Sequence, residues 1–459
     1  MSHIKKITAI ALFTLTLTGL GCSRGSEQAT EPVELSIWGV FDDEDNYGEV
    51  MESYRALHPN VSLSFREFRY EEYKEALIRA FAEGDGPDIF LLHNDWVKEY
   101  QSLIVPLPDA LTISYQEVKG AIKKDVVNVV RTEPTISMRA FNDRFIDIVE
   151  EDAILPYQPN EDKDAVNKVF ALPLAMDTMA LYWNKDLLNA AGIASAPTTW
   201  NAFQDAVMKL TKTDDLGRIV QSGAAMGTSD NVERSADLLA LLMMQNGTQM
   251  ADANGEATFD KLPADQTGNL PGLDAVRFYT DFANPTKAVY TWNADEPNSF
   301  DAFAKGTTAM FFGYAYHLPL IKTAAPKLNF AISAVPQIDG GRQVNFGNYW
   351  MATVSKDSEH VNYAWDFVQF LTTDAEQNVK YLGAARKPPA LRSLIAGQLE
   401  DEELSAFASQ VLTAKSWYRG KDVITAEAAL RELIDNILGG SVDPTQAIHR
   451  AVSQVNQTL

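Results

Sequence analysis

The amino-acid sequence predicts an α/β protein with parallel strands and helices on both faces of the sheet. The main observation is the segment 33–92, where strand and helix patterns alternate in the order strand, helix, strand, helix, strand. The second is the length of 459 residues with 46% apolar side chains, which suffices for two or three domains with cores of their own. In such sheets ligands bind at the carboxyl ends of the strands.

The first elements follow from local periodicity. Val33 to Val40 alternates apolar and polar residues as a half-buried strand does, and Asn46 to Leu57 carries its apolar side chains on one helical face. Val61 to Phe65 alternates again, and Tyr70 to Phe81 is a second helical pattern. Asp88 to Leu92 is an apolar run after a turn of Gly, Asp, Gly and Pro, so it predicts a third strand.

The stretch from Phe170 to Trp200 predicts two short strands, over 171–175 and 178–183, and then helices. Asp177 and Thr178 lie where the two strands join. Polar groups in such a place are either satisfied by nearby backbone donors or directed into a cleft, and the sequence leaves both open.

Elsewhere the pattern is less regular. Prolines interrupt helical patterns around 115–130 in the segment 106–168, which predicts an insertion that decorates the fold. A polar turn at 251–259 superficially resembles a calcium loop, but Lys261 stands where glutamate is required. Apolar spacing predicts helices over 200–244, 273–282 and 300–305, strands over 307–313, 330–335 and 351–354, and helices after 358.

The amino terminus predicts export. Lys5 and Lys6 precede an apolar run from Ile7 to Leu20 that is short for a membrane span and typical of a signal peptide. Cys22 is the only cysteine and follows this run, in a pattern that resembles bacterial lipoprotein signals, although Gly19 replaces the usual leucine. The resemblance implies a lipid anchor on Cys22 and a body outside the cytoplasmic membrane or in the periplasm. A plain secretory signal and an uncleaved anchor are the alternatives.

Composition and motifs exclude several functions. The formal net charge of -23 disfavours binding to nucleic acid and to anionic lipid. No nucleophile elbow, phosphate loop, dinucleotide fingerprint or zinc-protease motif is present, and no histidines pair at metal-ligand spacing. We therefore expect no enzyme, no cofactor and no metal. The many carboxylates leave a glycosidase-like pair as the one enzymatic possibility.

Aromatic and polar residues gather at predicted strand ends, where each ring alone is more often core but their joint position favours a binding site. Sugars stack their C–H faces on aromatic rings and need donors and acceptors for their hydroxyls. The candidates are Trp38, Asp42, Asn94, Asp95, Trp96, Asp177, Thr178, Tyr314, Asn348, Tyr349, Trp350 and Arg386. The sequence does not decide whether Trp292 and Trp417 also reach the cleft.

Four stretches together are similar to the extracellular solute-binding proteins of bacterial sugar importers of the ATP-binding-cassette type, the family that includes maltose-binding protein. They are the segment 170–200 with its Tyr-Trp-Asn-Lys and Pro-Thr-Thr-Trp, the segment from Gly86 to Trp96, Phe303 to Met310, and Gly347 to Ala352. By position, Asp95, Asp177, Trp38 and Asp42 match the sugar contacts of that family. Tyr314, Trp350 and Arg386 are looser matches.

The resemblance implies a two-lobed periplasmic-binding-protein-like fold, each lobe a central sheet flanked by helices, with the ligand between lobes that close by hinge motion. We expect three crossings, near Ala175 to Asp177, Ala309 to Gly313 and Trp350 to Thr353. The expected domains are a signal and anchor over 1–22, a flexible tether over 23–32, a first lobe over 33–175 plus 311–350, and a second, helix-rich lobe over 176–310 plus 351–459.

The expected function is capture of a sugar or oligosaccharide and its delivery to the permease of an ABC transporter. We expect a monomer that meets the membrane only through its anchor and binds no nucleic acid. The alternatives are a binding protein for a polyamine, peptide or glycerol phosphate, a secreted glycan-active enzyme, and a glycan-binding adhesin or sensor. A cationic ligand needs carboxylates beside aromatic rings and a phosphate needs clustered basic residues, and the sequence shows a clear version of neither.

Overall fold

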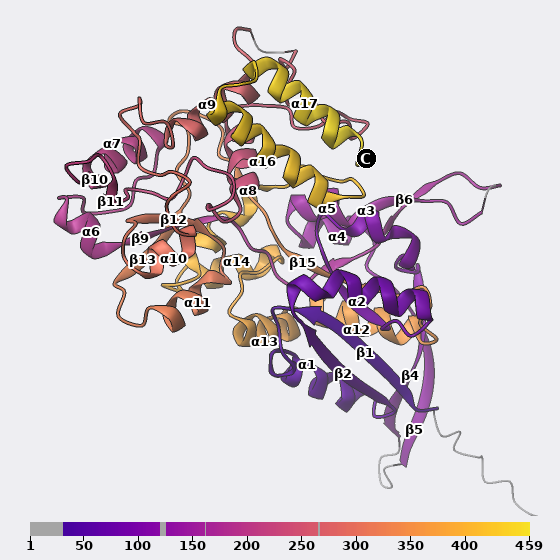
Figure 1. Cartoon of the computed structure of the whole chain (residues 1–459). Helices are drawn as coiled ribbons and strands as arrows, with labels where there is room; N and C mark the ends of the chain where they lie inside the picture. The colour runs from indigo at the N-terminus through magenta and orange to yellow at the C-terminus, as the bar shows by residue number, and fades with distance from the viewer. Residues whose placement is uncertain (1–30, 120–124, 161, 265–266) are drawn as a thin grey trace, which may run out of the picture.

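The computed structural model describes residues 31–119, 125–160, 162–264 and 267–459, and it has two lobes (Figure 1). The first lobe contains a five-stranded sheet in the order β2-β1-β3-β15-β8, and the second a three-stranded sheet in the order β12-β9-β13. The strands of the first sheet are β1 (Val33–Val40), β2 (Val61–Phe68), β3 (Ile89–His93), β8 (Leu172–Pro173) and β15 (Trp350–Val354). Those of the second are β9 (Ala180–Asn184), β12 (Met310–Gly313) and β13 (Phe330–Ala334).

The first elements agree with the sequence prediction. β1 pairs in parallel with β2 and β3, and helices α1 (Glu44–Leu57) and α2 (Tyr70–Glu83) connect them. α1 begins before the predicted Asn46 because Asp43 and Asn46 form a capping box, each side chain accepting the other's backbone N–H. α12 (Val361–Thr373) and α13 (Ala375–Ala385) pack with α1 on this sheet.

The parallel arrangement does not extend further. β15 runs antiparallel to β3 and β8, and β9 runs antiparallel to both β12 and β13. The second lobe therefore has an antiparallel sheet, so within the two central sheets the prediction of parallel strands is confirmed only for β1 to β3.

The segment 106–168 is mainly β structure, and the helical patterns around 115–130 are misleading. β4 (Ala110–Lys119) pairs along its whole length with β5 (Asp125–Pro134) in a long antiparallel hairpin. Valine and threonine recur there, and such β-branched residues favour strands. The segment ends in α4 (Met138–Arg144), α5 (Asp147–Ala153), and the hairpin of β6 (Ile154–Tyr157) and β7 (Val166–Val169). The helix α3 (Val97–Tyr100) and the short η1 (Gln101–Leu103) lie between β3 and β4.

Helices form most of the second lobe, as predicted. The predicted continuous helical region 200–244 is interrupted, because 211–234 contains β10 (Lys212–Thr213), β11 (Ile219–Gln221) and loops. The helices are α6 (Lys185–Ala190), α7 (Trp200–Leu210), α8 (Ser235–Gln245), α9 (Pro271–Asp281), α10 (Ser299–Ala304), α11 (His317–Ala324), α15 (Ser405–Ala408), α16 (Val423–Gly439) and α17 (Pro444–Asn456). Smaller elements are η2 (Val411–Thr413) and the pair β14 (Asn345–Phe346) and β16 (Ala414–Lys415).

Three segments pass between the two sheets, and only the first was placed correctly. It joins β8 to β9 and includes the predicted 175–177. The second joins β13 to β15, and the third leads from α13 through α14 (Arg392–Gln398) to α15. The predicted crossing at 309–313 is β12 inside the second lobe, and the predicted crossing at 350–353 is β15 inside the first.

The predicted lobe limits are accordingly wrong in two segments. Residues 311–334 belong to the second lobe, where β12 and β13 pair with β9, whereas 351–385 belong to the first lobe with β3 and α1. Local periodicity identifies a strand but not its pairing partner, which is why these segments were exchanged.

The crossings are hydrogen-bonded to one another. The Asn348 backbone N–H donates to the Asp177 carbonyl at 3.0 Å, and the Met176 N–H donates to the Pro388 carbonyl at 2.9 Å. The first crossing therefore contacts both others. Cys22 and most of the tether lie outside the described residues, and within 31–459 apart from the short gaps no helix is long and apolar enough to cross a bilayer.

Candidate functional site

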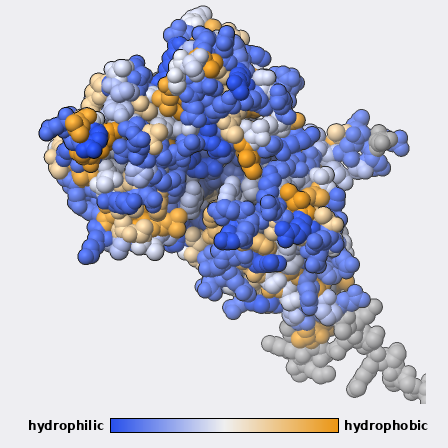
Figure 2. Space-filling view, viewed as in Figure 1, coloured by the Kyte–Doolittle hydropathy of each residue, from blue (hydrophilic) through white to orange (hydrophobic). Residues whose placement is uncertain are grey.

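A cavity of about 290 Å³ lies where the two lobes meet, at the carboxyl ends of β1 and β3. Figure 2 shows the surface hollowed and mainly hydrophilic there. The first lobe contributes residues after β1 and β3 and at the start of α2, and the second contributes residues before α8, before α11 and on α16. The crossings close the floor with Leu174, Ala175, Asp177, Asn348, Tyr349 and Lys387.

Among the aromatic rings that line the cavity, five form what we call the aromatic box: Phe41, Tyr70, Trp96, Tyr316 and Trp350. Phe41 stacks on Tyr70 at 5.7 Å between centroids and on Tyr316, also at 5.7 Å. Trp96 and Trp350 meet edge to face at 5.4 Å. Because Tyr316 belongs to the second lobe and the other four rings to the first, the box spans both lobes.

The backbone is strained at this site. Among the described residues, the non-glycine residues with positive φ are Phe41 (63°), Arg234 (54°) and Arg386 (53°). Phe41 and Arg234 line the cavity, and Arg386 precedes Lys387, which also lines it. Sparsely populated backbone conformations cost on the order of 1–3 kcal/mol each and collect at functional sites.

Arg234 is held in place by two carboxylates. Its Nε and Nη2 donate to Asp237 at 2.8 Å each, and Nη2 also donates to Glu427 at 2.8 Å. Burial disfavours the charged guanidinium, but Asp237 and Glu427 outweigh this effect and raise the pKa of Arg234. Tyr314 donates its hydroxyl to Asp237 at 2.6 Å, so this arginine is fixed from behind.

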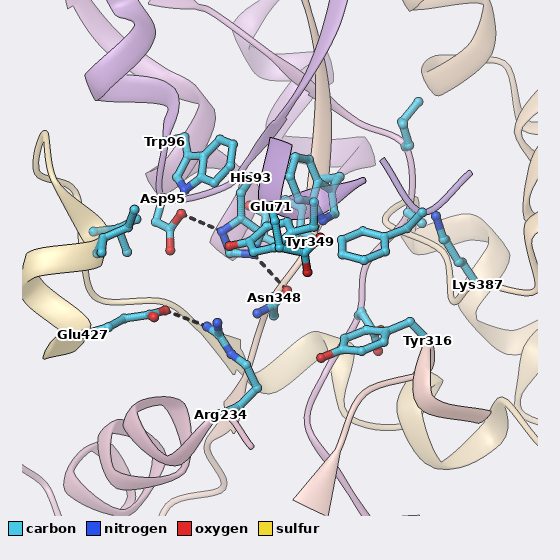
Figure 3. Close-up of a pocket in the computed structure, with 18 of the residues that line it drawn as sticks. Glu71, His93, Asp95, Trp96, Arg234, Tyr316, Asn348, Tyr349, Lys387 and Glu427 are labelled. Atoms are coloured by element: carbon cyan, nitrogen blue, oxygen red, sulfur yellow. Dashed lines mark hydrogen bonds and ion pairs between the residues drawn. The ribbon is translucent and has the colours of Figure 1, made fainter. Parts of the chain in front are cut away.

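His93 connects the first lobe to the second crossing. Its Nδ1 lies 2.5 Å from Asp95 Oδ1 and its Nε2 lies 2.8 Å from Asn348 Oδ1. Burial alone would lower the pKa of His93, but the Asp95 carboxylate and the Asn348 hydrogen bond raise it above 6.5. Figure 3 shows His93 and Asp95 on one side of the cavity and Arg234 with Glu427 on the other.

The sequence left open whether Asp177 is hydrogen-bonded to nearby backbone donors or directed into a cleft, and the structure shows both. The Asp177 carboxylate accepts the Thr178 backbone N–H at 2.8 Å and the Ala315 N–H at 2.9 Å, and it also faces the cavity. Burial raises the pKa of Asp177 to about 8, against the effect of these backbone donors. This side chain therefore changes its charge near neutral pH.

The structure brings half of the candidate residues together in the cavity. Asp95, Trp96, Asp177, Asn348, Tyr349 and Trp350 line it. They were recognisable because they follow or begin predicted strands, at the edge where the sheet meets the other lobe.

The other candidates serve the fold around the cavity. Buried Asp42 binds Lys387 and accepts the Tyr381 hydroxyl at 2.8 Å. Buried Asn94 donates to Asp152 at 3.0 Å. Tyr314, fully buried, supports Arg234 through Asp237 rather than facing the cavity.

Trp38, Thr178 and Arg386 also lie outside the cavity. The Trp38 ring packs on Phe68 at 4.7 Å and does not line the cavity. The Thr178 hydroxyl donates to the Phe407 carbonyl at 3.2 Å. Arg386 is exposed and forms ion pairs on the surface with Asp401 and Glu403, at 3.2 and 3.1 Å.

The structure also shows where Trp292 and Trp417 lie, which the sequence did not decide. Trp292 is fully buried and donates its ring N–H to Asn231 at 3.1 Å, away from the cavity. Trp417 lines a smaller neighbouring hollow, which also contains Asn94.

Sequence reasoning missed several lining residues, including all four lysine, arginine and glutamate side chains. The missed residues are Phe41, Tyr70, Glu71, His93, Leu174, Ala175, Arg234, Tyr316, Tyr381, Lys387, Val423, Ile424 and Glu427. His93 ends β3 and carried a usable signal, whereas Arg234 and Glu427 meet from positions 193 apart in the chain. No group of three or more His, Cys, Asp or Glu side chains in the described ranges is arranged to hold a metal ion.

Comparisons with known proteins agree with this architecture. A family model described as bacterial extracellular solute-binding protein matches residues 42–378. A putative binding protein of Brucella abortus is 21% identical over 330 residues, which cover 71% of this chain and 68% of that protein. Maltodextrin-binding protein MdxE of Bacillus subtilis is 21% identical over 418 residues, covering 86% and 88%.

Solved structures have the same fold. The crystal structure of the cyclic alpha-maltosyl-1,6-maltose binding protein from Arthrobacter globiformis superposes with a TM-score of 0.71 at 18% identity, and the match covers 93% of this chain and 99% of that one.

Proposed function

This chain belongs to the bacterial extracellular solute-binding proteins, and we propose that it captures a sugar or oligosaccharide between its lobes and delivers it to an ABC transporter permease. The observation that carries the proposal is the aromatic box, which lies between the lobes and is accompanied by polar side chains. Relatives named for maltodextrin and maltooligosaccharide binding support the same ligand class.

The geometry suits a flat, hydroxylated ligand. Ring faces of the box would stack on sugar C–H faces, at about 0.5–1.5 kcal/mol per aromatic contact by analogy with ring pairs. Asp95, Asp177 and Asn348 offer oxygen acceptors for hydroxyls, at about 0.5–1.5 kcal/mol for an ordinary hydrogen bond and about 1.5–3 kcal/mol where the acceptor carries a charge. A cavity near 300 Å³ lies at the lower end of the range usual for small-molecule sites, which suits a short glycan or the end of a longer one.

Capture would involve hinge motion. The first crossing is short and hydrogen-bonded to both others, and all three contribute to the floor of the cavity, so the lobes would rotate about them. The contact between Phe41 and Tyr316 joins the lobes and would open with them. We further propose that the protein works as a monomer outside the cytoplasmic membrane and that Cys22 carries the lipid anchor.

A calorimetric screen against neutral and charged mono- and oligosaccharides, polyamines and short peptides tests the proposal. The variant Tyr70→Ala removes an exposed ring of the box, and Tyr290→Ala removes a half-buried ring outside the cavity as its control. We expect one glycan class to bind, with affinity lost in Tyr70→Ala and kept in Tyr290→Ala. Binding of polyamines or peptides without any glycan contradicts the sugar assignment and leaves the fold unaffected.

A further inference from the structure

The basic side chains of the cavity are already neutralised by the protein itself. Arg234 binds Asp237 and Glu427 at 2.8 Å, so its positive charge is balanced within this group of three. Lys387 contacts the buried carboxylate of Asp42. Neither cation is therefore left to balance an anionic ligand.

Three further carboxyl groups face the cavity without a permanently charged partner. Glu71 lies exposed on the first turn of α2 and makes no ion pair with any described residue. Among the described residues, Asp95 pairs with the imidazole of His93 and with no lysine or arginine, and Asp177 accepts backbone N–H groups. Even with Asp177 protonated, the cavity and its supporting residues hold more carboxylates than cations.

The surplus carboxylates line the same cavity as the rings of the aromatic box. Glu71 follows Tyr70 in the chain and Asp95 precedes Trp96, and all four residues line the cavity. Tyr70 and Trp96 are themselves stacked, with centroids 6.2 Å apart. Aromatic faces and carboxylates both attract a cation, and together they are the environment that recognises ammonium groups.

The hydrogen-bond donors and acceptors of the cavity also favour an ammonium group. A neutral hydroxyl both donates and accepts a hydrogen bond, whereas an ammonium group only donates. Ionised carboxylates only accept, and the positive charges of the cavity's two permanent cations, Arg234 and Lys387, are already matched by carboxylates of the protein. A uronate or a phosphorylated sugar would meet carboxylates with no free basic group to bind it.

We propose that the cavity selects a glycan that carries a positively charged amino group, held by Glu71 and Asp95 beside the rings of Tyr70 and Trp96. The inference rests on the proposed function, because it specifies the ligand class of that same cavity. The rest of the glycan stacks against Trp350 and Tyr316, and the amino group supplies the charge that the protein leaves unbalanced.

Isothermal titration calorimetry of the full chain with matched glycans tests the inference. The probes are the β-1,4 trimers of glucosamine and of N-acetylglucosamine, which differ in charge, and maltotriose with its 6-amino derivative. We expect the amino form to bind about tenfold or more tightly than its neutral partner in at least one pair, and the preference to weaken at high salt.

The variant Glu71→Gln keeps the shape of the side chain and removes its charge, and Glu75→Gln makes the same change on an exposed part of α2 outside the cavity. We expect Glu71→Gln to weaken the amino form about tenfold and to leave the neutral form unchanged, while Glu75→Gln changes neither. Equal affinity for both forms, or no effect of Glu71→Gln, overturns this inference and leaves the proposed function intact. Failure of every glycan in both forms overturns the two together.

Discussion

Replacing Asp42 by asparagine removes the carboxylate that neutralises Lys387 and should destabilise the fold severely. Asp42 is 3% exposed and accepts the Tyr381 hydroxyl at 2.8 Å in addition to the Lys387 contact. Removing one partner of a buried ion pair costs about 3–5 kcal/mol, because the other charge is left unpaired. Since the Lys387 side chain is 20% exposed and water reaches it, we expect about 3 kcal/mol.

Urea unfolding followed by circular dichroism measures this loss, with Asp45→Asn on the exposed first turn of α1 as the control. The control should change stability by about 0.5 kcal/mol or less. Lys387→Met alone should also destabilise, whereas the double variant should recover about 2 kcal/mol of the summed losses, because no buried charge is then left unpaired. Simple additivity, or a stability of Asp42→Asn equal to that of the control, would refute the pairing argument.

Three further predictions concern titration and packing. The folded-state pKa of His93 is raised, so the stability that protonated His93 contributes should be fully present below about pH 6.5 and should disappear as the pH rises through the folded-state pKa. The variant His93→Gln should flatten this part of a pH–stability profile. Asp177 is raised from 3.8 to about 8, so the folded state holds an extra proton between these values, and stability should fall as the pH rises across them; Asp177→Asn should abolish that slope in the same measurement. A Cβ added at Gly272 would lie 2.2 Å from the Phe259 carbonyl oxygen, so Gly272→Ala should lower the melting temperature. On α13 a Cβ added at Gly383 meets no atom within contact distance, so Gly383→Ala should raise the free energy of unfolding by about 0.5–1 kcal/mol.

Elements whose information is local were predictable. The apolar stripe Trp200, Phe203, Val207 and Leu210 is buried on α7, and Thr199 caps that helix as its position predicts. Helical spacing and a capping hydroxyl both lie within one short segment, so no distant residue is needed to interpret them. The hairpin of β4 and β5 was missed because prolines and mixed charge obscured an alternation that only its pairing makes clear.

Pairing across the chain was beyond local reasoning. β9 is the centre of a sheet whose other strands come more than a hundred residues later, and nothing within 310–313 distinguishes an edge strand from a crossing. The same limit applies to the cavity. Asp95 and Trp96 were found because they follow β3, whereas Glu427 becomes a site residue only when α16 brings it to Arg234.

Two residues with a left-handed backbone conformation, Phe41 and Arg234, line the cavity. Phe41 and Arg234 occupy backbone conformations that their side chains disfavour, and each thereby directs its side chain into the space between the lobes. Most residues adopt the backbone conformation that their side chains prefer. Residues in disfavoured conformations persist where the surrounding structure holds them in place, and such residues collect at functional sites. The strained positions carry the Phe41 ring that contacts Tyr316 of the other lobe and the Arg234 guanidinium that binds Asp237 and Glu427, so the strain supports the shape of the cavity.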